Sequence, residues 1–277
     1  RSHLIAGVAG IILLGACSQG GDEDVTFVPE PPVMQETPPA GQLPEGVTPT
    51  AYRLALFTDP AQDDFSGTVE IDISLTDPHA RIWLHSLDQR ISEASATLPD
   101  GTVLQATFTR STAEGGVSRL DFETPVPAGN ATLKIDYMAP YNFGLAGLYK
   151  AEQNGRPYLA TQMEPIDARR MVPSFDEPRF KTPWTLTVTT PAGNQVITNG
   201  ALKSQTTLDD GNLQFEFATT RTIQSYLVAL AVGPYDLRDG GVLPPNEIRP
   251  RAVPFRGFAP AGKGDQLEEA MAITDEM

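Results

Sequence analysis

The sequence is poor in the side chains that most often bind transition metals. It has one cysteine, Cys17, and three histidines, His3, His79 and His85. A single cysteine excludes an internal disulfide, and the histidines have neither the H-E-x-x-H spacing nor another usual zinc-ligand spacing. The sequence therefore predicts that this chain cannot assemble a complete zinc site from the usual sets of ligands.

Basic residues are also scarce. Twenty Lys and Arg stand against 35 Asp and Glu, which gives a formal net charge of −15. Phosphate would repel such a chain, so the composition disfavours a nucleic-acid partner. The acidic excess is compatible with high solubility or with favourable encounters with cationic groups. With 277 residues, of which 40% are hydrophobic, the chain can form one large or two modest domains.

The one long apolar run covers residues 4–14, and it is followed by Gly15-Ala16-Cys17. The run is too short to span a bilayer and fits the core of a signal peptide. Its end resembles a bacterial lipobox, so we expect Cys17 to be lipidated and residues 1–17 to be a lipoprotein signal peptide. Ser18 after the cysteine favours the outer membrane, facing the periplasm. The alternative is an ordinary secretory signal with a chance cysteine.

Residues 18–47 contain six prolines with acidic residues between them. Such a composition buries too little apolar surface to fold, so we expect a disordered linker. A proline-rich chain extends by about 3.1 Å per residue and would hold the next domain away from the membrane. A binding motif is the alternative role for this segment.

The body of the chain has the period-2 pattern of half-buried strands at residues 68–75, 132–137, 184–189 and 213–217, with turn signals between them. Residues 226–232 are continuously apolar and predict a central strand. No convincing helical period occurs before Gly262. The expected fold is mainly β, a saddle-shaped antiparallel multi-sheet or β-sandwich-like domain at residues 48–247.

The last segment has a helical pattern. Asp265 begins an apparent capping box that ends at Glu268, and apolar or small residues then recur at helical spacing. The stripe consists of Leu267, Ala270, Met271, Thr274 and Met277. It continues to the last residue without a C-cap, so we expect this chain to be the front part of a longer protein.

Charged residues are concentrated between residues 161 and 178, among turn-forming prolines. This stretch contains T-Q-M-E-P at 161–165, D-A-R-R at 167–170 and P-S-F-D-E-P at 173–178. Charged groups crowded onto an irregular loop of a rigid scaffold often mark a recognition site.

These three motifs resemble the aminopeptidase N family of zinc metallopeptidases, the gluzincins. G-L-A-G-L-Y at 144–149, S-Y-L-V-A at 225–229 and G-K-G at 262–264 resemble further segments of that family in the same order. The resemblance implies an amino-terminal β-saddle domain, with residues 248–277 as the truncated start of an α+β zinc-peptidase domain. It also implies removal of single amino-terminal residues from peptides.

By the same resemblance, Glu164 accepts hydrogen bonds from the free α-ammonium of the substrate, and Gln162 lines the pocket for its first side chain. A carboxylate distinguishes an ammonium from an internal amide by charge, and hydrogen bonds to charged groups contribute about 1.5–3 kcal/mol. Zinc would be bound by sequence after Met277, so this chain alone would be inactive, with no catalytic residue and no metal ligand.

Several other interpretations stay open at this stage. Glu164 could merely end a strand, and Gln162 could be a buried amide. The remaining charged residues of the stretch favour a structural ion-pair network, and His79 and His85 favour surface or packing roles. These charged residues are Asp167, Arg169, Arg170, Asp176 and Glu177. The whole protein could instead be a non-catalytic envelope lipoprotein that binds peptides or a partner, or a family relative that hydrolyses a non-peptide substrate.

Overall fold

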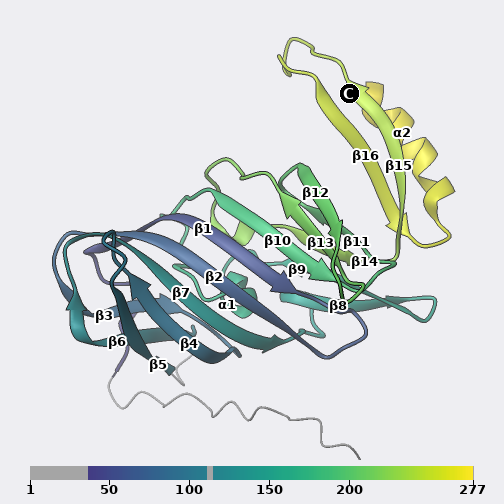
Figure 1. Ribbon diagram of the computed structural model, residues 1–277. Coiled ribbons are helices and arrows are strands. Elements are labelled where there is room, and N and C mark those ends of the chain that lie inside the picture. The colour runs from purple at the N-terminus through teal and green to yellow at the C-terminus, as the bar shows by residue number, and fades with distance from the viewer. Residues whose placement is uncertain (1–36, 111–114, 277) are drawn as a thin grey trace, which may run out of the picture.

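The computed structural model describes residues 37–110 and 115–276, and within them the chain is mainly β (Figure 1). Ten strands form one strongly twisted sheet. In spatial order they are β12 (Leu202–Thr207), β13 (Leu213–Phe217), β10 (Trp184–Thr190), β1 (Val47–Phe57), β2 (Asp64–Leu75), β7 (Gly129–Pro140), β4 (Arg90–Thr97), β5 (Val103–Arg110), β6 (Val117–Val126) and β3 (His79–His85). Strands β1 and β10 are parallel, and the other neighbouring pairs are antiparallel.

The alternating sequence pattern explains which face of this sheet is buried. In β2, Val69, Ile71 and Ile73 are buried, while the residues between them are partly exposed on the opposite face. The four alternating segments predicted as strands lie in β2, β7, β10 and β13, so these predictions are confirmed. The expected mainly β, antiparallel multi-sheet fold is confirmed as well.

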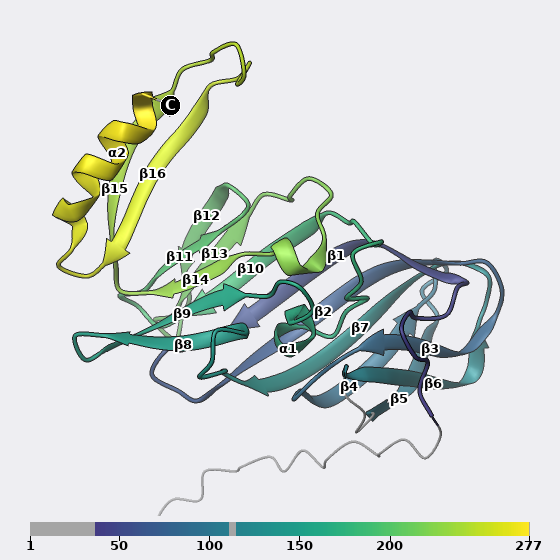
Figure 2. The same ribbon diagram turned by 180° about the vertical axis from the view of Figure 1, so that it is seen from behind.

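A second sheet of four strands packs near one face of the first (Figure 2). Its strands, in spatial order, are β11 (Gln195–Thr198), β14 (Leu230–Gly233), β9 (Arg156–Gln162) and β8 (Gly147–Gln153). The short helix α1 (Ala168–Met171) follows β9. No helical period predicted α1, because a single turn is too short to show one.

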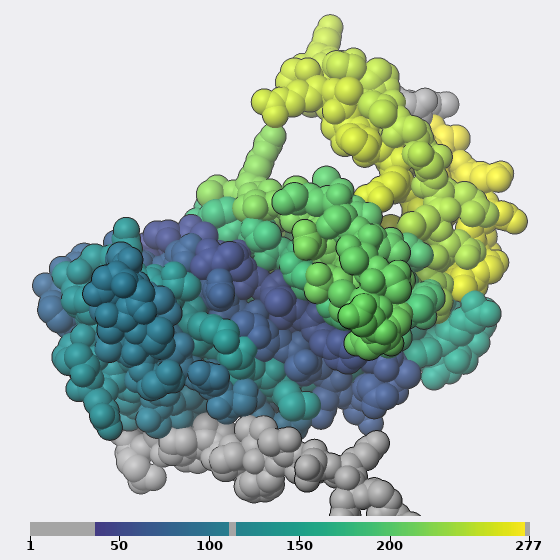
Figure 3. All heavy atoms as spheres, in the orientation of Figure 1, coloured from purple at the N-terminus to yellow at the C-terminus, as the bar shows by residue number. Residues whose placement is uncertain are grey.

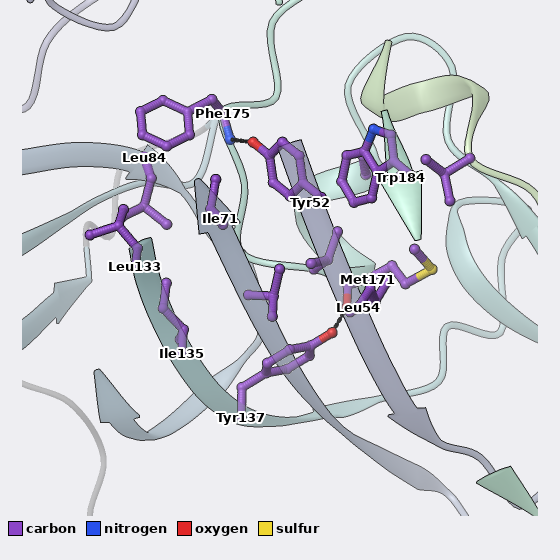
Figure 4. Packing of buried hydrophobic residues seen from close by; sticks show 14 of the residues in the cluster. Tyr52, Leu54, Ile71, Leu84, Leu133, Ile135, Tyr137, Met171, Phe175 and Trp184 are labelled. Atoms are coloured by element: carbon purple, nitrogen blue, oxygen red, sulfur yellow. Dashed lines mark hydrogen bonds between the residues drawn. The ribbon is translucent and has the colours of Figure 1, made fainter. Parts of the chain in front are cut away.

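Aromatic side chains join α1 and its flanking loop to the large sheet (Figure 4). The ring of Tyr52 stacks on Trp184 with centroids 3.9 Å apart, and the Tyr52 hydroxyl accepts the backbone N–H of Phe175 at 3.0 Å. The Tyr137 hydroxyl donates to the carbonyl of Met171 at 2.9 Å. Burial raises the pKa of both tyrosines. The segment after β9 is therefore fixed to the sheet by paired polar groups within an apolar core.

The predicted strand at residues 226–232 is partly wrong. Residues Ser225–Leu227 form a 3-10 turn, and β14 starts only at Leu230. The side chain of Asn199 bonds the intervening backbone, since its Nδ2 donates to the Leu227 carbonyl at 2.9 Å and its Oδ1 accepts the Ala229 N–H at 2.7 Å. A side chain thus replaces the ladder that a continuous strand would need. The short strand β14 is nevertheless interior to its sheet, as expected.

The hairpin of β15 (Tyr235–Leu243) and β16 (Val253–Pro260) projects from the rest of the molecule and carries η2 (Gly264–Gln266) and α2 (Leu267–Glu276) (Figure 3). Two residues of the apolar stripe of α2, Leu267 and Met271, pack on this hairpin. A Cβ added to Gly257 would lie 2.9 Å from the sulfur of Met271 and 3.2 Å from a methyl group of Leu267. The predicted helix is confirmed, and Leu267 and Met271 of its stripe have a partner within the chain, while Ala270 is exposed.

Asp265 is not the helix N-cap that the sequence predicts. It lies inside η2, and its carboxylate accepts a hydrogen bond from Arg238 at 2.8 Å. Asp236 supplies the neighbouring carboxylate instead, accepting the N–H groups of Gly262 and Gly264 at 2.7 and 3.0 Å. These bonds lower the pKa of Asp236. The turn before α2 is therefore held by a residue 28 positions upstream of Gly264.

The ordered domain begins before residue 48. Leu43 is buried in the hydrophobic core, and β1 starts at Val47, so the end of the expected linker is folded. The expected boundary between residues 247 and 248 falls in the connection from β15 to β16. Cys17, the expected signal peptide and the expected linker as far as residue 36 lie outside the described residues. Across the ranges 37–110 and 115–276, none of the helices has the length and apolar character needed to cross a membrane.

Candidate substrate-binding loop

The loop from β9 to α1 carries both residues proposed to bind substrate. Strand β9 ends at Gln162, and the next side chain, Met163, is buried. The backbone then turns back on itself, since the N–H of Asp167 donates to the carbonyl of Met163 at 2.9 Å. Gln162 and Glu164 are both exposed, and the Glu164–Pro165 peptide bond is cis. Gln162 is therefore not a buried core amide.

Directly after this turn, Arg169 enters the interior of the protein. Its guanidinium donates to the carboxylate and to the carbonyl of Asp176, both at 2.9 Å, and to the carbonyl of Gly115. The Arg169 and Asp176 side chains are 7% and 1% exposed. The Arg169 charge is therefore paired with a buried carboxylate and also hydrogen-bonded to two carbonyl groups, and these interactions offset the cost of burying it.

Asp176 receives further bonds from two other segments. Its second carboxylate oxygen accepts a hydrogen bond from the hydroxyl of Ser225, and its backbone N–H donates to Nδ1 of His85 at 3.2 Å. Burial, together with the nearby Arg169 charge, lowers the pKa of His85 to about 3. His85 is therefore a neutral hydrogen-bond acceptor in the packed interior, which agrees with the packing role considered from the sequence.

The neighbouring Arg170 faces the surface. It donates to Asp167 at 2.9 Å and to Asp88 at 2.7 Å. Glu177 pairs with Arg179, and both bind the backbone of Leu43. The Glu177 carboxylate accepts the Leu43 N–H, and the Arg179 guanidinium donates to the Leu43 carbonyl. The structural ion-pair network predicted for this stretch is confirmed.

The nearby Arg179, which pairs with Glu177, was missed at the level of sequence. Three distant members of this network were missed as well: Asp88, Ser225 and Leu43. They lie tens of residues or more from their partners, and no local pattern marks them. A cleft of about 750 Å³ lies beside the network, lined among others by Ile166, Arg169 and Glu177. Neither Gln162 nor Glu164 lines this cleft, and both side chains are exposed elsewhere on the loop.

The described residues do not fit a zinc site. Over residues 37–110 and 115–276, no group of three or more His, Cys, Asp and Glu side chains could hold a metal ion. His85 uses Nδ1 to accept the Asp176 N–H, and Asp176 is occupied by Arg169 and Ser225. The nearby acidic groups therefore serve the ion-pair network.

The fold and the loop define a class of protein: a multi-sheet β-domain that presents an exposed acidic loop on a buried ionic base. Residues 48–227 match the family model for the peptidase M1 N-terminal domain. The chain belongs to the peptidase M1 family and contains its amino-terminal domain.

Similar proteins include an aminopeptidase N from Acetobacter pasteurianus, 29% identical over 86% of this chain and 65% of its own length. A glutamyl aminopeptidase from Sus scrofa is 29% identical over 70% of this chain and 22% of its own length. Aminopeptidase M1 from Arabidopsis thaliana is 27% identical over 84% of this chain and 26% of its own length. The chain thus spans just under two thirds of the first relative and about a quarter of the other two.

The buried ion pair predicts a large difference between two Asp-to-Asn substitutions. Asp176→Asn leaves the Arg169 charge buried without its counter-ion, so the free energy of unfolding should fall by about 3–5 kcal/mol. Asp64→Asn, which removes an exposed pair with Arg90, should cost under about 1 kcal/mol. Urea unfolding of the full chain measures both values, and equal costs would contradict the assigned role of Asp176.

His85 predicts a pH dependence of stability. Its folded pKa of about 3 lies below the usual value of 6.5, so the fold favours the neutral imidazole. The resulting stability is complete above pH 6.5 and is lost as the pH falls towards 3. His85→Asn keeps an acceptor near Nδ1 but does not titrate, so its free energy of unfolding should fall less steeply over this range. Parallel curves for the two proteins in urea titrations would contradict this assignment.

Proposed function

We propose that this chain is the front part of a zinc aminopeptidase that removes single amino-terminal residues from peptides. In this proposal Glu164 accepts hydrogen bonds from the substrate α-ammonium, and Gln162 lines the pocket for the first side chain. The support is the family membership, the names of the similar proteins and the state of the Glu164 carboxylate.

The proposal depends on one observation, which is that the Glu164 carboxylate has no partner among the described residues. The acidic side chains between residues 161 and 178 are Glu164, Asp167, Asp176 and Glu177. The last three are paired with arginines. Glu164 is exposed and makes no hydrogen bond or ion pair with another described residue. Its charge is therefore available to an external cation, and a peptide's terminal ammonium has the complementary charge and three donors.

In this proposal the carboxylate of Glu164 also sets the register of the peptide substrate. A buried internal amide cannot replace the ammonium, because it would leave the charge of Glu164 without a counter-ion. Binding at the α-ammonium then sets which carbonyl lies one residue further into the site. Glu164 holds the substrate in this scheme and transfers no proton.

Peptidase M1 aminopeptidases are zinc-dependent in general, and we expect the metal ligands to come from a further part of the protein. When bound, zinc polarises a carbonyl group and activates a water molecule. The residues of this chain bind and orient the peptide, and by itself the chain should be inactive.

We further infer that the protein is a lipoprotein of the bacterial cell envelope, facing the periplasm from the outer membrane. The support is the apolar run at residues 4–14, the lipobox that ends in Cys17 and the proline-rich linker that follows. Several acyl chains on one cysteine would anchor the protein stably, because each buried methylene contributes about 0.8 kcal/mol. The linker would keep the peptide-binding loop clear of the lipid surface.

Substitution of Glu164 tests the proposed substrate contact. In the full-length protein, Glu164→Gln and Glu164→Ala should lower kcat/KM for a peptide with a free amino end about 10- to 100-fold, since a charged hydrogen bond contributes about 1.5–3 kcal/mol. The preference for this peptide over its N-acetylated form should shrink by the same factor. The matched control is Glu123→Gln, an exposed glutamate on β6. Unchanged kcat/KM in both Glu164 variants would remove Glu164 from the site.

Substitution of Cys17 tests the anchor. Cells that express the full-length protein and are fed radiolabelled palmitate should incorporate label into it and retain it in the membrane fraction. Cys17→Ser should abolish the label and release the protein, because the thiol that receives the lipid is gone. Equal labelling of the two proteins would contradict lipidation at Cys17.

A further inference from the structure

The two adjacent arginines of the D-A-R-R motif have opposite surroundings. Arg169 is buried, and its contacts lie inside the domain. The side chain of Arg170 is 33% exposed, and its guanidinium lies at the base of the loop that carries Gln162 and Glu164. Arg169 therefore supports the fold, while Arg170 is placed to control the geometry of the loop.

Arg170 contacts one end of this loop directly and the strand beside its other end. At the far end, its Nε binds the Asp167 carboxylate at 2.9 Å, and its own N–H donates to the Asp167 carbonyl at 3.1 Å. At the near end, its stem lies against Gly147, where an added Cβ would be 2.7 Å from the Arg170 Cβ. Gly147 is the β8 residue directly opposite Gln162 in the β8–β9 register. Arg170 therefore binds the last residue of the turn directly and packs against Gly147, which pairs with the residue where the loop begins.

Arg170 also connects this loop to the ten-stranded sheet. Its Nη1 donates to Asp88 at 2.7 Å, and Asp88 lies in the turn from β3 to β4. The neighbours of Asp88 are themselves fixed, because the Leu87 N–H and the Gln89 side chain both donate to the Arg169 carbonyl at 2.9 Å. Asp88 therefore binds the Arg170 guanidinium from a backbone segment that hydrogen bonds hold in place.

We propose that Arg170, held by Asp88, is a positioning residue that sets where the Glu164 carboxylate stands relative to the large sheet. This inference rests on the proposed function of Glu164. Arginine suits the task because its planar fork fixes two carboxylates in defined directions. Exposed ion pairs contribute little to stability, whereas a misplacement of about 1 Å in a binding group can cost about 100-fold in rate. Loss of Arg170 therefore affects substrate binding far more than folding.

A double-mutant cycle in the full-length protein tests this inference. Arg170→Gln should lower kcat/KM for a free-amine peptide about 10-fold, mainly through KM, and should leave the melting temperature nearly unchanged. Arg170→Lys keeps the charge and should recover part of the loss. Asp88→Asn removes the same pair from the other side and should reproduce the loss. In a Glu164→Ala background, Arg170→Gln should have no further effect, because the group that it positions is absent.

The matched control is Arg90→Gln, which removes another half-exposed arginine from a pair with an aspartate, Asp64, and should leave kcat/KM unchanged. A loss of equal size with and without Glu164 would overturn the inference, and so would wild-type kinetics in Arg170→Gln and Asp88→Asn. If Arg170→Gln does not fold, Asp88→Asn replaces it in the cycle. If Glu164→Ala lowers kcat/KM while Arg170→Gln and Asp88→Asn do not, only the inference about Arg170 is overturned. If Glu164→Ala leaves kcat/KM unchanged, the proposed role of Glu164 in substrate binding is overturned as well.

Discussion

The buried pair of Arg169 and Asp176 is the interaction on which the presentation of this loop depends. Helix α1 has only four residues, and so short a helix has no stability of its own in water. It is held because the Arg169 guanidinium is paired with the buried carboxylate of Asp176 and donates to the carbonyls of Asp176 and Gly115. Desolvated charges tolerate little displacement, since an unpaired charge in the interior is costly. The loop before α1 therefore has a fixed base.

On this base, the acidic residues of one short stretch divide into two kinds. Asp167, Asp176 and Glu177 pair with nearby arginines, while Glu164 keeps its charge exposed. A recognition group needs both features: rigid surroundings, and a charge that no neighbour neutralises. The tyrosine hydroxyls that bind Phe175 and Met171 add further rigidity from the large sheet (Figure 4).

Much of the fold could be predicted from the sequence because the period-2 pattern records burial directly. Strands β2, β7, β10 and β13 were found in this way. Local sequence patterns gave wrong predictions where a side chain from a distant part of the chain forms the hydrogen bonds expected from a neighbouring residue or strand. Asn199 bonds the backbone at residues 227 and 229, so the expected strand begins only after them. Asp236 takes the place expected for Asp265 before α2.

The sequence predicted an ion-pair network at this site, but it did not predict which distant residues take part in it. The crowding of charges indicated an ion-pair network, and the family resemblance singled out Glu164 and Gln162. Asp88, Ser225 and Leu43 join that network from other parts of the chain, and only the folded topology brings them there. The exposure of Glu164 likewise follows from which carboxylates the arginines bind, and the sequence does not state this pairing.

The most direct test of this account is a crystal structure of the full-length protein bound to a non-hydrolysable dipeptide analogue with a free amino end. The account predicts that a Glu164 carboxylate oxygen lies within about 2.7–3.2 Å of the α-nitrogen, with the Arg169–Asp176 pair intact beneath the loop. A bound analogue whose α-nitrogen is held by other groups, with Glu164 turned towards solvent, would contradict it.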